Sequence, residues 1–120
     1  MRPAGNEFGR ILRRLRFEKG ETLHSLASQV GYSASFLSSV ETGSRAVPHD
    51  LASRLAKHFR LTGENKKDFM ARAEETKTRI MIDLREATPI QRRAAILFAK
   101  RFRRLSNNAI SKIYELLMEV

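Results

Sequence analysis

The sequence predicts a mainly α-helical protein with one short β-strand, and three observations support this prediction. Apolar residues recur with the i, i+3, i+4, i+7 spacing of a buried helix face along most of the chain. Serine or threonine stands before several of these segments, and Gly20, Gly31 and Gly43 follow three of them, as helix caps do. Residues 79–84 instead alternate apolar and polar side chains, as a strand does.

Five amphipathic helices are expected in the first part of the chain. Their apolar faces consist of Phe8, Ile11, Leu12 and Leu15; Leu23, Leu26, Ala27 and Val30; Phe36, Leu37 and Val40; Leu51, Ala52, Leu55 and Phe59; and Phe69, Met70 and Ala73. Thr22 and Ser33 are suited to cap the second and third helices. Pro48 and Thr62 are expected to start the fourth and fifth.

The second half is expected to hold the strand and two more helices. Residues 88–91 form a capping box with proline at the first helical position, and they open a helix to about residue 104. Ser106 is suited to cap the last helix. A lone strand leaves backbone groups unpaired, and a second copy of the chain is the nearest source of a partner strand. The alternative is that residues 79–84 merely end the fifth helix.

Composition sets the class of protein. A chain of 120 residues with 42% hydrophobic and 30% charged residues is expected to fold as a globule, and no cysteine is present for disulfides or thiolate metal sites. The longest apolar run, residues 94–99, is too short to span a bilayer. The N-terminus lacks the apolar stretch of a signal peptide. We therefore expect a cytoplasmic protein without a membrane partner.

The charge balance points to a polyanionic partner. The chain carries 23 basic and 13 acidic residues, a net charge of +10. Residues 1–60 hold ten basic and five acidic groups and residues 61–120 hold thirteen and eight, so each half carries +5. DNA, RNA or an anionic membrane surface would suit such a chain.

Residues 22–43 carry the strongest functional signal. Two short helices are joined by a tight turn at Gly31, where a left-handed backbone is inexpensive, so the second helix can leave at a steep angle. The outer face of the second helix is small, polar and free of acids. It consists of Ser33, Ala34, Ser35, Ser38, Ser39 and Thr42. Such a face can enter the major groove of DNA without repulsion.

The run from Thr22 to Gly43, TLHSLASQVGYSASFLSSVETG, resembles the Cro/C1-type helix-turn-helix of the XRE family, which is lambda-repressor-like in fold. The match rests on L-A-x-x-x-G followed in register by x-E-x-G, with agreeing flanks, and covers roughly residues 6–61. It implies a five-helix DNA-binding domain, which we assign to residues 1–61, with the helix 34–41 in the major groove. Residues 62–120 are left as a C-terminal helical dimerisation region.

The resemblance also implies roles for single residues. Glu41 is expected to form a structural pair with Arg16 and to have no catalytic part. Leu23 stands where the family often has a glutamine that touches DNA, and Ala34 stands where it often has glutamine or arginine, so long hydrogen-bonding side chains are missing. Because hydroxyls discriminate bases weakly, we expect operator choice to depend on dimer spacing and DNA shape.

The expected DNA contacts fall into two groups. Base contacts are assigned to Ser33, Ala34, Ser35, Ser38 and Ser39. Phosphate contacts are assigned to Thr22, Leu23, Tyr32, Thr42, Ser44, Arg45, His49, Arg13 and Arg14. For Arg13 and Arg14 a solvated helix face is the alternative.

A dimer is expected because modules of this kind bind two half-sites about one DNA turn apart. The dimerisation residues are assigned as Ile80, Ile82, Leu84, Leu97, Phe98, Ile113 and Leu117. The alternative is that these residues cap the core of a monomer. The basic run 100–104 is either a second nucleic-acid patch or a solvated helix face around a buried Phe102, and we favour the solvated face.

Two other classes of function were weighed. The histidines are isolated at 24, 49 and 58, and the chain has neither a metal-binding spacing nor a nucleophile elbow. We therefore expect no enzyme activity, no metal and no cofactor. The expected function is a dimeric repressor that binds a palindromic operator. The alternative is an antitoxin whose C-terminal half neutralises a toxin protein while the chain represses its own promoter.

Overall fold

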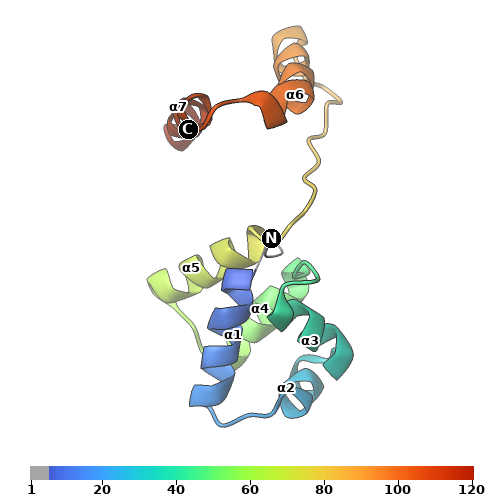
Figure 1. The fold of residues 1–120 in the computed structure, drawn as a ribbon, viewed down its shortest axis with the longest axis vertical. Coiled ribbons are helices and arrows are strands. Elements are labelled where there is room, and N and C mark those ends of the chain that lie inside the picture. The colour runs from blue at the N-terminus through green and yellow to red at the C-terminus, as the bar shows by residue number, and fades with distance from the viewer. Residues whose placement is uncertain (1–5) are drawn as a thin grey trace. The chain divides into compact units, whose positions relative to one another are not determined.

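The computed structural model describes residues 6–120 and separates into two compact units, with the division between Ile80 and Met81 (Figure 1). The first unit holds α1 (Asn6–Glu18), α2 (Leu23–Val30), α3 (Ala34–Thr42), α4 (His49–His58) and α5 (Gly63–Glu74). The second holds α6 (Pro89–Arg101), the 3₁₀ helix η1 (Phe102–Arg104) and α7 (Asn107–Met118). The mainly α-helical class is confirmed.

The first unit is built around one apolar core to which all five helices contribute. Its buried side chains include Phe8, Leu12, Leu26, Ala27, Val30, Leu37, Val40, Leu51, Ala52, Leu55, Ala56, Phe69 and Ala73. The rings of Phe8 and Phe69 lie 4.9 Å apart, so α5 packs against α1. The apolar spacing read from the sequence therefore identified most of the core, but it missed Ala56. Six residues of the expected faces are only partly buried: Ile11, Leu15, Leu23, Phe36, Phe59 and Met70.

Side-chain caps fix where the short helices begin. The Thr22 hydroxyl accepts a hydrogen bond from the Ser25 amide at 3.0 Å, and the Ser33 hydroxyl accepts one from the Phe36 amide at 3.0 Å. These bonds satisfy amides that the first helical turn leaves unpaired. In the second unit the expected capping box at residues 88–91 is formed in full.

Helices α1 and α3 approach each other unusually closely at Gly9. A Cβ added there would lie 2.0 Å from the Glu41 carbonyl oxygen. Only glycine leaves room for this contact, because a methyl group would push the two backbones apart. No pattern in the sequence singled out Gly9.

The β-strand expected at residues 79–84 is absent from the part of the chain that the structure describes. Residues 79–84 lie between α5 and α6 without regular structure. Ile80 and Ile82 are 76% and 64% exposed. A strand needs a neighbour to receive its backbone hydrogen bonds, and no other segment of this chain has a strand pattern. The alternation of side chains was therefore insufficient to predict a strand.

The second unit contains helices but no buried side chain. Every residue from 77 to 120 is exposed or only partly buried. Phe102, expected to be buried, is 53% exposed, although its ring packs against Phe98 at a centroid distance of 5.4 Å. Two short helices joined by a 3₁₀ turn provide too few neighbours to enclose a phenyl ring. No helix within residues 6–120 is long and apolar enough to cross a membrane.

Candidate nucleic-acid interface

Helices α2 and α3 pack against each other through a tight turn. Gly31 ends α2 with φ at +77°, and the Tyr32 amide donates to the Ala27 carbonyl at 3.1 Å. Leu26 and Leu37 are fully buried beside the turn. The chain therefore turns within three residues, and Ser35 and Thr42 of α3 stay exposed, whereas Ala34 packs against the core.

The outer side of α3 presents small hydroxyl and methyl groups. Ser33, Ser35 and Thr42 are exposed, whereas Ala34, Ser38 and Ser39 are partly buried. The Ser39 hydroxyl donates to the Ser35 carbonyl at 3.2 Å, and the Thr42 hydroxyl donates to the Ser39 carbonyl at 3.2 Å. Both hydroxyls still offer acceptor lone pairs to a ligand.

The single acid of α3 is turned inward. Glu41 is 5% exposed, and its carboxylate accepts bonds from Arg16 Nε at 2.8 Å and Arg16 Nη2 at 3.2 Å. Arg16 also donates to the Glu21 carbonyl at 3.0 Å. The structure thus brings Arg16 and Glu41 together as a contact between α1 and α3. The outer side of α3 consequently carries no negative charge.

Arg13 is drawn partly into this contact. Its Nε lies 3.5 Å from Glu41 Oε1, while half of the Arg13 side chain remains accessible. Arg14 is exposed and has no ion pair within residues 6–120. Of these two expected phosphate contacts, Arg14 is the freer side chain.

A row of stacked side chains lies beside α3. The Arg45 guanidinium sits 5.0 Å from the Phe36 ring centroid, and the Phe36 and Tyr32 rings are 5.2 Å apart. The Tyr32 hydroxyl donates to the Asp50 carboxylate at 2.9 and 3.0 Å. Desolvation raises the pKa of Tyr32, and the bond to Asp50 raises it further. This row orients Arg45 next to α3.

Sequence reasoning assigned Phe36 to the core and did not consider Asp50. In the structure Phe36 is only partly buried and supports Arg45. The contact could have been anticipated only from the three-dimensional neighbourhood, because Arg45 lies nine residues beyond Phe36 and outside the helix.

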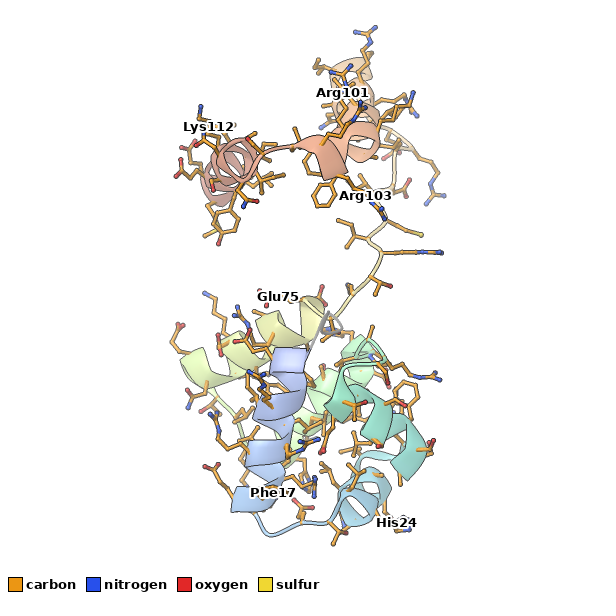
Figure 2. All side chains as sticks on the ribbon, viewed as in Figure 1. Phe17, His24, Glu75, Arg101, Arg103 and Lys112 are labelled. Atoms are coloured by element: carbon orange, nitrogen blue, oxygen red, sulfur yellow. The ribbon has the colours of Figure 1, made fainter. Side chains whose placement is uncertain are left out.

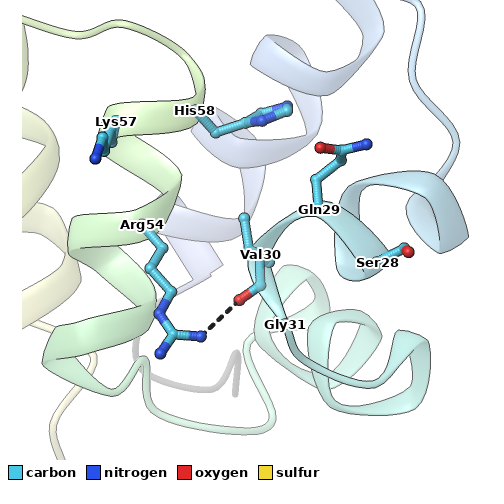
Figure 3. Close-up of a pocket in the computed structure, with 7 residues that line it drawn as sticks. All are labelled: Ser28, Gln29, Val30, Gly31, Arg54, Lys57 and His58. Carbon is cyan, nitrogen blue, oxygen red and sulfur yellow. Dashed lines mark hydrogen bonds between the residues drawn. The ribbon is translucent and has the colours of Figure 1, made fainter.

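A shallow pocket between α2 and α4 is shaped by Arg54 (Figure 3). Its Nη1 donates to the Val30 carbonyl at 3.0 Å, which caps the C-terminal end of α2. A Cβ at Gly31 would lie 2.9 Å from this nitrogen. The arrangement stabilises the turn ahead of α3, since it satisfies a carbonyl that the helix end leaves unpaired.

The remaining assigned residues differ in their exposure. Thr22, Ser44 and His49 are exposed, and Leu23 is partly buried against the core. Of the assigned dimerisation residues, Leu84, Phe98 and Ile113 are partly buried and Ile80, Ile82, Leu97 and Leu117 are exposed. Within residues 6–120, no group of three or more acidic or histidine side chains is arranged to hold a metal ion.

Two helices at a steep turn, with the second presenting an acid-free outer side, define a helix-turn-helix protein that binds DNA. The sequence comparison agrees, because the family model described as a helix-turn-helix domain matches residues 7–69. The match covers just over half of the chain, and the chain belongs to this family. Comparison of this chain with curated proteins and with solved structures found no match.

Proposed function

We propose that this protein is a sequence-specific transcriptional regulator of the Cro/C1 type, acting on DNA in the cytoplasm. It binds a palindromic operator as a dimer, and it represses by occupying the promoter. One observation carries this proposal. The outer side of α3 has no acidic side chain, because the only acid of the helix, Glu41, is buried against Arg16. The negatively charged phosphates on both sides of a groove would meet no negative charge there.

Contacts to the DNA backbone support the docking of α3. The first turns of α2 and α3 offer amides that phosphate can bind, next to the caps at Thr22 and Ser33. Arg45, held over Phe36, supplies a charged contact just beyond α3. Replacing Arg45 with alanine should weaken binding to all sequences and reduce the salt slope by about 1. An unchanged slope would remove Arg45 from the phosphate contacts.

Base readout by α3 is expected to be modest. A bidentate arginine or glutamine contact is worth about 1–3 kcal/mol of discrimination, whereas α3 offers serine hydroxyls and the Ala34 methyl group. The spacing of two half-sites and the shape of the DNA then supply much of the specificity.

The second unit is the proposed dimerisation region. Its apolar side chains remain accessible in a single chain, including Leu116 at 62%, Leu117 at 67% and Met118 at 68% on α7. A second copy would cover this apolar surface, since two-fold dimers are the commonest assembly. Sedimentation equilibrium at micromolar concentration should give twice the chain mass of 13.8 kDa.

Selection of bound duplexes from a random pool, at a stated salt concentration, tests the proposed function. A palindrome with half-sites about one turn apart is the expected result. Uniform enrichment would contradict sequence-specific regulation.

The accessible apolar side chains of α7 also favour a second candidate, an antitoxin whose C-terminal unit binds a toxin protein. The two candidate functions differ in the oligomeric state that they require of the chain. A chain that remains monomeric at micromolar concentration, and still binds its selected DNA, would support the antitoxin over the dimeric repressor.

A further inference from the structure

Helix α6 and η1 concentrate positive charge without any compensating acid. Residues 89–104 contain six basic residues and no aspartate or glutamate: Arg92, Arg93, Lys100, Arg101, Arg103 and Arg104. All six are exposed. None of them forms an ion pair with any residue from 6 to 120. Figure 2 shows Arg101 and Arg103 projecting from this segment.

Helix α5 differs from α6 in that some of its charges are paired. Its exposed residues mix both signs of charge, and Arg72 lies 4.0 Å from Asp68 and 3.2 Å from Glu75. Pairs of this kind offset repulsion along a helix surface. Because α6 lacks such pairs, its exposed cations are left available to an anionic partner.

The cations of α6 cover the side of the helix away from its aromatic rings and extend onto the flanks, where Arg101 lies. Arg93 and Lys100 are seven residues apart and share one side, since two helical turns separate them. Phe98 and Phe102, whose rings are in contact, lie on roughly the opposite side. Docking of the aromatic side onto a second copy would leave the cationic side free. The cationic sides of two copies would not pack on each other, because both carry positive charge.

We propose that the cationic side of α6 and η1 is a second DNA-binding surface, which contacts the phosphate backbone of the duplex flanking the operator. The proposal rests on the proposed function, since α3 brings the DNA to the chain. Residues 77–88 join the two units and reach about 40 Å at full extension. A duplex of that length carries about two dozen phosphates, which sets the length of flanking DNA that α6 can contact.

Such contacts would raise affinity without changing sequence preference. Phosphate oxygens carry no sequence information, and each cation that neutralises one adds about 0.9 to the salt slope of binding. The signature is therefore a steeper salt dependence on long duplexes than on the operator alone.

The experiment compares two double variants of the full chain, K100Q/R101Q in α6 and K66Q/K67Q in α5. Both change two adjacent exposed cations, and glutamine preserves helix propensity. Binding is measured across salt concentrations on the selected operator and on the same operator extended by about 12 base pairs at each end, the length that the tether spans. On the extended duplex, K100Q/R101Q should lower the slope by about 1.8 for each bound chain, which is about 3.6 for a bound dimer, and K66Q/K67Q should leave it unchanged.

On the trimmed operator, K100Q/R101Q should bind like the unmodified protein. An unchanged slope on the extended duplex would overturn the proposal, and so would an equal loss in both double variants. Loss of binding to anionic phospholipid vesicles together with an unchanged DNA slope would assign the cationic side to a membrane and also overturn it. Failure of the proposed function looks different, because the unmodified protein would then select no operator.

Discussion

Replacing Glu41 with alanine tests the contact that keeps the outer side of α3 free of acid. The Glu41 carboxylate is buried and holds Arg16 through bonds of 2.8 and 3.2 Å. Without the carboxylate, the Arg16 guanidinium keeps the Glu21 carbonyl at 3.0 Å and the Phe17 ring at 4.9 Å, while just 12% of the Arg16 side chain is accessible. The variant therefore leaves a nearly buried cation without its counter-ion.

Removing one partner of a buried ion pair costs about 3–5 kcal/mol of folding free energy. The remaining bond and the partial exposure of Arg16 favour the lower end, about 3 kcal/mol. For a domain of this size, such a loss lowers the melting temperature by roughly 12 °C or more. Urea unfolding followed by far-ultraviolet circular dichroism measures the change.

Two further variants make this prediction specific. Glu74→Ala removes an exposed carboxylate that pairs with Lys77 at 2.8 Å, and it should leave the unfolding midpoint unchanged. Adding Arg16→Met to Glu41→Ala should recover part of the lost stability, because the uncompensated cation is gone. If Glu41→Ala unfolds at the same urea concentration as Glu74→Ala, the assigned role of the buried pair is wrong.

The remaining predictions concern the packing around the interface. Gly9→Ala should lower stability by about 1–3 kcal/mol in urea unfolding, because the new methyl meets the α3 backbone; an unchanged midpoint would deny the close approach. Thr76→Val should cost about 1–3 kcal/mol because the buried Val47 amide loses its acceptor at 2.9 Å, and Thr76→Ser should cost far less; equal losses would refute the role of the hydroxyl. Asp50→Asn should lower the pKa of Tyr32. Ultraviolet absorbance measures this pKa once the other tyrosine is replaced by phenylalanine, and an unchanged pKa would contradict the hydrogen bond between Tyr32 and Asp50. Since the pKa of Tyr32 is raised on folding, its contribution to stability is present below pH 10 and is lost as pH rises through the folded value.

The helices of the first unit could be predicted because their signals are local. Each apolar face repeats with the helical period, and Thr22 and Ser33 cap helices within three residues of themselves. The burial of Glu41 against Arg16 was available only through the resemblance to known helix-turn-helix proteins, since 25 residues separate the two in sequence.

The parts that could not be predicted depend on neighbours distant in sequence. Residues 79–84 show a strand's alternation, but a strand forms only where a second strand offers its backbone groups. Phe102 has the helical spacing of a buried residue, yet the second unit has too few elements to cover it. The row from Arg45 to Asp50 joins a loop, a turn and two helices, and no sequence period connects them.

The central claim is that α3 enters the major groove at two half-sites. Methylation interference with dimethyl sulfate on the selected duplex tests it directly, because guanine is methylated at N7 in the major groove and adenine at N3 in the minor groove. We predict interference by guanine methylation in two patches about 10 base pairs apart. Interference confined to adenines, or a single patch, would contradict the account.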